Sequence, residues 1–487
     1  MTQLIDSTLL KSSSYINGSW LTKTESSENV TNPATGTVIT SLNLATDEDA
    51  QNAIVAADKA FKEWKNTSIK TRFKVLKKWF DLIIDNKQDL ATIMTLEQGK
   101  PLAESLGEVD YGASYVEWFA EEAKRIYGDV INLPEQDRQG LVIRQPVGVV
   151  AAITPWNFPN AMITRKAAPA LAAGCTIIIK PALETPLSAL ALAELADRAG
   201  IPAGVINVIV GKSRVLGKVL TDSSIVRKLT FTGSTPVGKV LIKQCADTVK
   251  RTSMELGGNA PLIIFDDADL DKAVNATITS KFRNSGQTCI CANRILVQEG
   301  IYQKFVEKLT DKVNQFRLGN GIDNNTTHGP LVSKKAANDV NNLVQIAITQ
   351  GAKVEIGGKI SPLGDCYFEP TILTNLHARM DIFREEIFGP VAPIFKFRDE
   401  QDAMEMANDT EFGLASYIYT NNLRLALRMA KNIEYGMVGI NEVAISSEII
   451  PFGGIKESGS GREGSKHGLE DYTEMKYICL GGLTDSD

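Results

Sequence analysis

The chain has 487 residues, enough for two or three domains that share an extensive core. Hydrophobic residues make up 43% and charged residues 23%, which excludes a mainly disordered or fibrous protein. The 52 Lys and Arg residues and the 58 Asp and Glu residues give a net charge of −6 without long runs of one sign, so we expect no nucleic-acid partner.

The start of the chain and its apolar runs predict a cytoplasmic protein without membrane contact. Residues 1–7 lack the basic flank and the apolar stretch of a signal peptide, and no apolar run approaches the length of a membrane span. The 6 cysteines lack C-x-x-C spacing and only 3 histidines are present, so we expect neither a disulfide scaffold nor a metal site. A cysteine nucleophile in this chain would need a base other than histidine.

The N-terminal region is predicted to be mainly helical. Thr46 and Asp49 form a capping box ahead of an amphipathic stretch over 47–64, and further helical patterns run over 71–86 and 108–126. The aromatic residues of the last pattern recur on one helical face, which favours core packing or a subunit contact over a cofactor site. They are Tyr111, Tyr115, Trp118 and Phe119.

From Pro146 onward, short apolar runs alternate with Ala-rich helical stretches, which predicts βαβ units and a parallel sheet. Ligands of such sheets bind beyond the carboxyl ends of the strands, so we expect a nucleotide there. The expected strands cover 147–153, 176–180, 205–210 and 228–231, and the expected helices cover 161–173, 186–199 and 213–221.

A second α/β segment is expected to begin near Leu256. Its elements are strands over 261–265 and 294–298 with a helix over 270–282 between them. A Gly-rich polar stretch then precedes a last apolar run over 476–480, which would either extend a partner's sheet or form an ordinary edge strand.

Two glycine-containing segments compete for the role of a dinucleotide-binding turn. Residues 459–464, GSGREG, match G-x-G-x-x-G, but no strand directly precedes them and too few residues follow for a βαβ unit. We interpret them as a flexible connecting loop. The strand ending at Phe231 instead leads into Gly233-Ser234 and a helix, an order that points free N–H groups and the positive helix end at a phosphate. Turn geometry alone also explains many such Gly-Ser pairs.

Three side chains are candidates for catalysis. Cys289 lies on a Gly-containing loop, where donor N–H groups can approach a thiol, although a lone cysteine is more often structural. Glu255 ends a strand next to a Gly-Gly turn, and partial burial would raise its pKa as a general base requires; a solvated loop carboxylate is the alternative. Asn157 follows the first strand of the βαβ region, and its amide can donate to an oxyanion.

Five motifs follow one another along the chain: Pro155-Trp156-Asn157-Phe158-Pro159, Phe231-Thr232-Gly233-Ser234-Thr235, Glu255-Leu256-Gly257-Gly258-Asn259, Gly286-Gln287-Thr288-Cys289 and Glu385-Glu386-Ile387-Phe388-Gly389-Pro390. Together they resemble the motifs of the NAD(P)-dependent aldehyde dehydrogenase superfamily. The resemblance implies an α/β fold with a Rossmann-like cofactor domain (1–125 and 146–255), an α/β catalytic domain (256–452) and a small β oligomerisation segment (126–145 and 453–487). It also implies a homo-oligomer, either a dimer or a tetramer.

The resemblance assigns the catalytic roles. Cys289 would form a thiohemiacetal with the aldehyde, Asn157 and the backbone N–H of Cys289 would stabilise the oxyanion, and Glu255 would activate the water that hydrolyses a thioester. The implied cofactor-binding residues are Thr154, Pro155, Trp156, Lys180, Pro181, Ala182, Leu183, Gly233, Ser234, Leu256, Glu386 and Phe388. The cofactor would be NADP or NAD. Leu183 stands where NAD-preferring members often carry Glu, so the sequence favours NADP and leaves NAD open.

Other stretches resemble succinate-semialdehyde dehydrogenases: residues 162–166, 281–284 and 289–294, and the Ser446-Ser447 pair. By this resemblance Arg165 and Arg283 would clamp the carboxylate of the substrate and Ser447 would add a hydrogen bond, although either Arg could instead make a structural ion pair. The implied reaction oxidises succinate semialdehyde to succinate in 4-aminobutyrate breakdown. Glutarate semialdehyde is the alternative, because one methylene is worth only about 1–3 kcal/mol of discrimination.

Further alternatives remain. One is a non-enzymatic structural relative, which the intact set of Asn157, Glu255 and Cys289 argues against. A cofactor-independent cysteine hydrolase would also use Cys289 and Glu255, but it has no need of the nucleotide-like turn at Gly233. Cys291 is either a small buried residue or the partner of Cys289 in a reversible disulfide, a redox switch known in some relatives.

Overall fold

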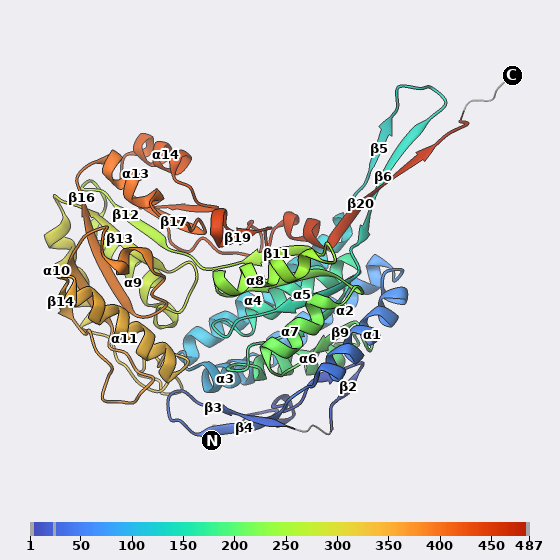
Figure 1. Cartoon of the computed structure of the whole chain (residues 1–487), viewed down its shortest axis with the longest axis horizontal. Helices are drawn as coiled ribbons and strands as arrows, with labels where there is room; N and C mark the ends of the chain where they lie inside the picture. Colours follow the sequence, from blue (N-terminus) through green and yellow to red (C-terminus); the bar gives the residue numbers. More distant parts are fainter. Residues whose placement is uncertain (1–3, 23–25, 484–487) are drawn as a thin grey trace.

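The computed structural model describes residues 4–22 and 26–483; residues 1–3, part of the predicted N-terminal lead, lie outside this range. Two large sheets, each with its own helices, form the body, and a thin three-stranded arm projects from it (Figure 1). None of the helices within the described ranges is both long enough and apolar enough to span a membrane.

The first large sheet has eight strands in the order β19-β11-β10-β7-β8-β9-β1-β2. Its five central strands are parallel and joined by helices, as the alternating pattern predicts, while β19, β1 and β2 pair antiparallel at the edges. The strands are β1 (Tyr15–Ile16), β2 (Ser19–Trp20), β7 (Val149–Ile153), β8 (Thr176–Lys180), β9 (Ile206–Val208), β10 (Val226–Thr232), β11 (Arg251–Glu255) and β19 (Gly459–Ser460). The helices are α5 (Ala161–Ala173), α6 (Leu187–Ala199), α7 (Ser213–Asp222) and α8 (Thr235–Ala246).

The second large sheet has seven strands in the order β14-β15-β16-β13-β12-β17-β18, and only β14 runs antiparallel to its neighbour. The strands are β12 (Ala260–Ile264), β13 (Ala292–Gln298), β14 (Lys353–Ile356), β15 (Thr371–Leu376), β16 (Val391–Phe397), β17 (Ala415–Tyr419) and β18 (Met437–Ile440). The helices are α9 (Leu270–Phe282), α10 (Tyr302–Val313), α11 (Lys334–Thr349), α12 (Asp381–Arg384), α13 (Glu400–Asn408) and α14 (Leu423–Asn432).

Both sheets are buried on two faces. Along β8, Ile177 and Ile179 enter one apolar cluster and Ile178 enters another on the opposite face, because successive strand residues point to opposite sides. All three side chains are fully buried, and each contributes on the order of 1.5–3 kcal/mol of transfer free energy. The rigid sheets thereby fix the loops at their carboxyl ends, where the candidate site residues lie.

The N-terminal region is less helical than predicted, because four short strands precede the first helix. Besides β1 and β2 these are β3 (Ser27–Thr31) and β4 (Val38–Asn43). The helices that follow are α1 (Asp47–Trp64), α2 (Ile69–Asp85), α3 (Lys87–Gln98) and α4 (Leu102–Glu122). The last begins six residues earlier than the predicted 108, directly after Pro101, the N-cap residue, whose ring fixes φ at −56°.

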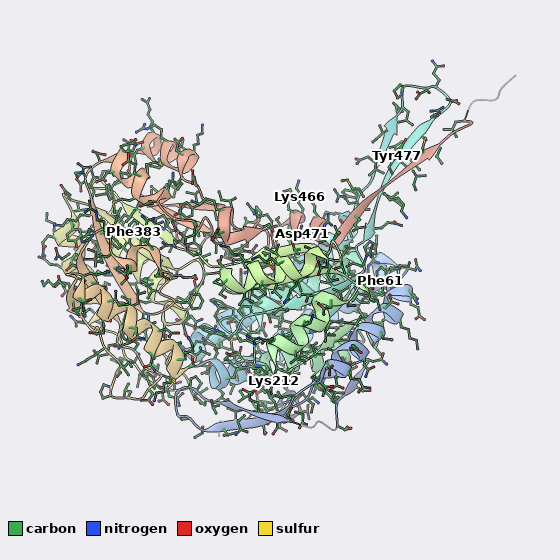
Figure 2. The ribbon with its side chains drawn as sticks, in the orientation of Figure 1. Phe61, Lys212, Phe383, Lys466, Asp471 and Tyr477 are labelled. Atoms are coloured by element: carbon green, nitrogen blue, oxygen red, sulfur yellow. The ribbon has the colours of Figure 1, made fainter. Side chains whose placement is uncertain are left out.

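The arm consists of β5 (Asp129–Asn132), β6 (Gln139–Pro146) and β20 (Thr473–Leu480). The terminal strand pairs along its whole length with β6 of its own chain, and its other edge is unpaired within the described residues. Figure 2 shows Tyr477 on this arm, away from the body; its side chain is 57% exposed. The 3-10 helices are η1 (Ser7–Leu9), η2 (Ala123–Arg125), η3 (Arg283–Gly286), η4 (Lys456–Ser458) and η5 (Lys466–Tyr472).

The interpretation of GSGREG as a flexible connecting loop is wrong. Gly459 and Ser460 form β19, which pairs with the end of β11 at Glu255 and Met254. The segment therefore closes the edge of the eight-stranded sheet beside Glu255. The sequence conceals this strand because two residues hold their extended form only through the hydrogen bonds of a distant partner.

Candidate active site

The loop that carries Cys289 has a fixed and unusual backbone. After α9 the chain passes through three consecutive residues with positive φ, Asn284 (51°), Ser285 (52°) and Gly286 (76°). A Cβ on Gly286 would lie 2.1 Å from the carbonyl oxygen of Gly389, so only glycine fits there. The turn brings Cys289 back over the ends of both sheets, where its side chain is partly exposed.

Two adjoining cavities meet at Cys289. One, of about 270 Å³, lies at the carboxyl edge of the eight-stranded sheet, and the other, of about 290 Å³, lies on the side of α4 and α5. Cys289 and Met162 line both. A thiol placed in this way can react with a molecule in one cavity while a second molecule occupies the other.

Asn157 lies directly after β7 and reaches the Cys289 loop. Its Nδ2 donates a hydrogen bond to the carbonyl oxygen of Gln287 at 3.0 Å, and its side chain is buried. The amide carries a second N–H that can donate to an oxygen atom at Cys289. Asn157 and Cys289 both line the cavity at the sheet edge.

Glu255 is the last residue of β11 and faces the same cavity. Burial raises the pKa of its carboxyl well above the ordinary value, the charge of Glu463 adds to this rise, and Arg165 and Lys166 oppose it. Its Oε2 atom is buried and has no hydrogen-bond partner in the described part of the chain. A carboxyl with these properties suits a general base.

The surroundings of Cys289 favour the protonated thiol. Burial raises its pKa to about 12, helped by the carboxylates of Glu386 and Glu255 and opposed by Arg165. Because the thiolate is the nucleophile, a proton acceptor is needed near the sulfur. Glu255 and Glu386 are the carboxyl groups that share the sheet-edge cavity with the thiol.

Seven of the predicted cofactor residues line the cavity at the sheet edge: Pro155, Trp156, Gly233, Ser234, Leu256, Glu386 and Phe388. The order of strand, Gly-Ser turn and helix is present, with β10 ending at Thr232 and α8 beginning at Thr235. A Cβ on Gly233 would meet the ring of Phe231 at 2.4 Å, so the turn requires glycine. The N–H of Gly233 itself donates to the carbonyl oxygen of Glu255 at 3.0 Å, and the positive end of α8 suits a phosphate.

Side chains opposite the turn suit the sugar end of a nucleotide. The rings of Trp156 and Phe388 meet edge to face with centroids 5.4 Å apart. Glu386 Oε1 accepts a hydrogen bond from the N–H of Gly258 at 3.0 Å, and burial raises the pKa of this carboxyl to about 7. Buried atoms Thr232 Oγ1 and Asn157 Oδ1 lack partners among residues 4–22 and 26–483. A dinucleotide therefore fits the polarity of this cavity.

The other five predicted cofactor residues, Thr154, Pro181, Ala182, Leu183 and Lys180, are not part of the cavity wall. Lys180 ends β8, and its Nζ donates to Ser213 Oγ at 2.7 Å and to its neighbour's carbonyl at 2.9 Å. Burial lowers the pKa of the Lys180 ammonium to about 8, and the negative charge of Glu184 opposes this decrease. Leu183 packs against the core of the first sheet. Their contact with a cofactor stays a prediction.

The two arginines predicted to bind a carboxylate both line the second cavity, but they differ in burial and in ion pairing. Arg165 is 2% exposed, and its Nη2 lies 2.7 Å from Glu463 Oε2 in a buried ion pair. Arg283 is exposed, lies over the ring of Phe158 at 5.5 Å, and makes no ion pair within the described ranges. Arg165 thus makes the structural ion pair that was the alternative to substrate binding. The charge of Arg283 remains available to a ligand.

Ser447 does not line this cavity. Its hydroxyl donates to Glu448 Oε2 at 2.9 Å, whereas Ser446 lies in the cavity wall and shares a hydrogen bond with the hydroxyl of Tyr111. Tyr111 also corrects the interpretation of the aromatic stripe. Tyr115 and Phe119 are buried in the core as predicted, but Tyr111 lines the cavity and accepts a hydrogen bond from Arg165 Nη1 at 3.3 Å.

Cys291 is buried and points away from solvent. Its Sγ accepts a hydrogen bond from Lys281 Nζ at 3.2 Å. Burial raises the pKa of this thiol, and Lys281 opposes the rise. All six cysteines are free thiols, and no three His, Cys, Asp or Glu side chains are grouped as metal ligands in the described ranges.

The aldehyde dehydrogenase family model matches residues 20–478. The chain belongs to this family. The structure is also similar to the crystal structure of an NADP-dependent enzyme of Escherichia coli, which is 53% identical; the TM-score is 0.97, and the match covers 98% of this chain and 100% of the other. Betaine aldehyde dehydrogenase from Staphylococcus aureus in complex with NAD+ is 37% identical, with a TM-score of 0.95 and coverage of 98% and 96%.

Three curated relatives are 54% identical to this aldehyde dehydrogenase. They are 3-sulfolactaldehyde dehydrogenase of Pseudomonas putida (99% of this chain and 100% of the relative), glutarate-semialdehyde dehydrogenase of Pseudomonas aeruginosa (99% and 100%) and the NADP(+) succinate-semialdehyde dehydrogenase of Escherichia coli strain K12 (98% and 100%). The predicted family and α/β fold class are therefore confirmed. The protein is an oxidoreductase that oxidises an aldehyde with NAD or NADP.

Sequence reasoning missed several residues of the aldehyde dehydrogenase site. Lys100, Glu108, Phe158 and Phe452 line the second cavity, and Glu463 pairs with Arg165 behind it. One signal was available for Glu463. Two adjacent cations, Arg165 and Lys166, stand in an otherwise apolar Ala-rich helix and require a buried acid.

Proposed function

We propose that this aldehyde dehydrogenase oxidises succinate semialdehyde to succinate with reduction of NADP or NAD, in 4-aminobutyrate catabolism. The observation that carries the proposal is Arg283 in the cavity beside Cys289, which is exposed and makes no ion pair with any residue of 4–22 or 26–483. A guanidinium in that place can bind the carboxylate of a short semialdehyde while its aldehyde end reaches the thiol. The names of the Escherichia coli and Pseudomonas aeruginosa relatives support a semialdehyde substrate.

The chain's own residues perform the following steps. Cys289 loses its proton to a nearby carboxylate and adds to the aldehyde carbon, giving a thiohemiacetal. The second N–H of the Asn157 amide and the backbone N–H of Cys289 stabilise the oxyanion. A nicotinamide cofactor held in the cavity of Glu386 and Phe388 would supply the hydride acceptor for this carbon, which would leave a thioester on Cys289. Glu255 then removes a proton from the water that hydrolyses the thioester.

For the cofactor we favour NADP and retain NAD. Glu386 and Phe388 would hold the nicotinamide ribose, and the Gly233-Ser234 turn with α8 would hold the pyrophosphate. Leu183 places no carboxylate where it would repel a 2′-phosphate, and the buried Lys180 beside Ser213 adds a positive charge near that edge. The relative named for NADP(+) supports this preference, and the Staphylococcus aureus complex with NAD+ keeps the alternative open.

The arm supports a homo-oligomer, a dimer or a tetramer. Met475 (70%), Tyr477 (57%) and Val130 (69%) are strongly exposed apolar side chains on β20 and β5, and β20 has an unpaired edge in the described chain. The cofactor domain is proposed to contain 1–125 and 146–255, the catalytic domain 256–452, and the oligomerisation segment 126–145 and 453–487. We expect the enzyme in the cytoplasm.

Glutarate semialdehyde is the second candidate, because the cavity does not distinguish two substrates that differ by one methylene. The test measures kcat/KM for succinate semialdehyde, glutarate semialdehyde, 3-sulfolactaldehyde and uncharged butanal, each with NADP and with NAD, from the absorbance of the reduced nicotinamide. We expect the highest value with succinate semialdehyde and NADP. Equal values for butanal and succinate semialdehyde would refute an anionic substrate, and ester hydrolysis without aldehyde oxidation would favour a cysteine hydrolase.

A further inference from the structure

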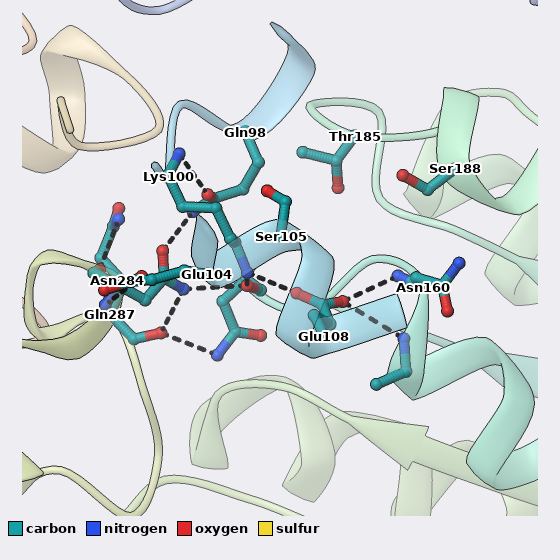
Figure 3. Close-up of polar contacts among 12 residues, drawn as sticks. Gln98, Lys100, Glu104, Ser105, Glu108, Asn160, Thr185, Ser188, Asn284 and Gln287 are labelled. Atoms are coloured by element: carbon teal, nitrogen blue, oxygen red, sulfur yellow. Dashed lines mark hydrogen bonds and ion pairs between the residues drawn. The ribbon is translucent and has the colours of Figure 1, made fainter. Parts of the chain in front are cut away.

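Two buried side chains from distant parts of the sequence hold the main-chain carbonyl of Asn157. Lys100 Nζ donates to this oxygen at 2.7 Å and Asn284 Nδ2 donates to it at 2.9 Å. Lys100 is 2% exposed and Asn284 is 1% exposed. Figure 3 shows Lys100 between Glu108 on one side and the segment of Asn284 and Gln287 on the other.

Glu108 makes the burial of this lysine possible. Its Oε2 lies 2.5 Å from Lys100 Nζ, and both side chains are 1% exposed. Its Oε1 accepts hydrogen bonds from the backbone N–H groups of Asn160 at 3.0 Å and Ala161 at 3.2 Å, at the start of α5. The ion pair therefore fastens both ends of the 157–161 segment to α4. An ion pair buried this far from solvent requires such hydrogen bonding, because burying either ion alone would cost several kcal/mol.

Asn284, the second donor to this carbonyl, is itself held by hydrogen bonds. Gln98 Nε2 donates to Asn284 Oδ1 at 3.0 Å. The backbone N–H of Asn284 donates to Glu104 Oε2 at 2.8 Å. Gln98 Oε1 in turn accepts from the N–H of Lys100 at 2.9 Å. The end of α3, the start of α4 and the loop after α9 thus form one hydrogen-bonded frame around the carbonyl of Asn157.

We propose that Lys100 is a positioning residue for aldehyde oxidation: by holding the Asn157 carbonyl, it aims the Asn157 amide at the oxygen of an aldehyde bound to Cys289. The proposal rests on the proposed role of Asn157 as oxyanion donor. The frame fixes the backbone of Asn157 on one side, and the hydrogen bond from its Nδ2 to Gln287 fixes its side chain on the other. A shift of about 1 Å in such a donor is enough to slow a reaction about 100-fold.

Lys100 also lines the cavity that contains Arg283, so a role in binding the substrate carboxylate has to be considered. Its geometry argues against that role. The ammonium directs hydrogen bonds at Glu108 and at the Asn157 carbonyl, and its remaining side lies 4.2 Å from the centre of the Phe158 ring. An ammonium has three donors, so none is left for a substrate anion.

The first test compares K100M with the parent enzyme and with K87M. Lys87, the first residue of α3, is a matched control, because it also pairs with a carboxylate of α4, that of Asp110, but there the two side chains are 32% and 54% exposed. With saturating cofactor, K100M is expected to lower kcat about 10- to 100-fold for butanal and for succinate semialdehyde alike, with KM changed less than about threefold. K87M is expected to keep the parent values. A loss confined to the anionic aldehyde, or a rise in KM alone, would overturn the proposal.

The second test is a double-mutant cycle with N157A, run with butanal so that it does not depend on the proposed substrate. If Lys100 acts through Asn157, adding K100M to N157A lowers kcat by less than about threefold. Multiplication of the two single effects would show that Lys100 acts independently, and the positioning role would be wrong. Should K100M fail to fold, N284G replaces it in the cycle, since glycine keeps the positive φ at 284 while removing the second donor to the carbonyl.

Discussion

The Asn157 side chain donates a hydrogen bond to the carbonyl oxygen of Gln287 at 3.0 Å, and so joins the loop after β7 to the loop that carries Cys289. The first loop belongs to the eight-stranded sheet and the second to the seven-stranded sheet. Each sheet is rigid because both of its faces are buried. The proposed nucleophile and the proposed oxyanion donor are therefore fixed relative to one another before any substrate arrives.

Cys289 provides the first prediction. C289A is expected to abolish aldehyde oxidation while leaving the dissociation constant of NADP within about threefold of the parent, because the thiol is only one of the groups that line the cavity proposed to hold the cofactor. In the parent, the rate of alkylation by iodoacetamide is expected to rise steadily from pH 7 to 10, since a thiol whose pKa is near 12 is protonated over this whole range. C366A is the control. Alkylation that is already at its maximum at pH 7 would contradict the raised pKa.

The role of Glu255 is tested through the pH dependence of thioester hydrolysis. Below its raised pKa the carboxyl is neutral and cannot accept a proton, so kcat should increase as the pH rises through that pKa. E255Q is expected to lower kcat about 100- to 10,000-fold, to remove this pH dependence and to leave a first burst of reduced nicotinamide equal to the enzyme concentration. E299Q is the matched control, because Glu299 is exposed and directly follows β13. An unchanged pH profile in E255Q would exclude Glu255 as the base.

The sequence predicts elements whose ends are set by local chemistry. The bounds of α1, α5 and α9 match the prediction because Thr46 and Asp269 cap two of them and Gly174 ends the third. The strand β19 escapes prediction because it depends on β11, far away in the sequence. The same limit applies to the site: Cys289, Glu255 and Asn157 stand in motifs, whereas the bond between Lys166 and Glu463 joins residues 297 positions apart. The sequence also does not show which residue of an irregular loop points into a cavity. The prediction therefore named Ser447, whereas Ser446 lines the cavity.

The two arginines of the second cavity should respond differently to substitution. R283M is expected to raise KM for succinate semialdehyde about 10- to 100-fold, the value of one or two charge-assisted hydrogen bonds, and to leave KM for butanal unchanged. R165M instead breaks a buried ion pair and should lower the free energy of unfolding by about 3–5 kcal/mol. Kinetics with both aldehydes and urea unfolding measure the two effects, with the exposed R379M as control. Equal effects of R283M on both aldehydes would exclude a carboxylate contact.

Cys291 gives the last prediction, which concerns reversible oxidation. Hydrogen peroxide converts the Cys289 thiol to a sulfenic acid with release of water, and the Cys291 thiol can then form a disulfide with release of a second water. Cys291 must first leave its hydrogen bond with Lys281, 3.2 Å away, so the disulfide should form slowly relative to the sulfenic acid. The parent is expected to lose activity in peroxide and regain it in dithiothreitol, whereas C291A should lose activity permanently as Cys289 oxidises further. C366A should behave like the parent. Recovery of C291A to the same extent would show that Cys291 is only a small buried side chain.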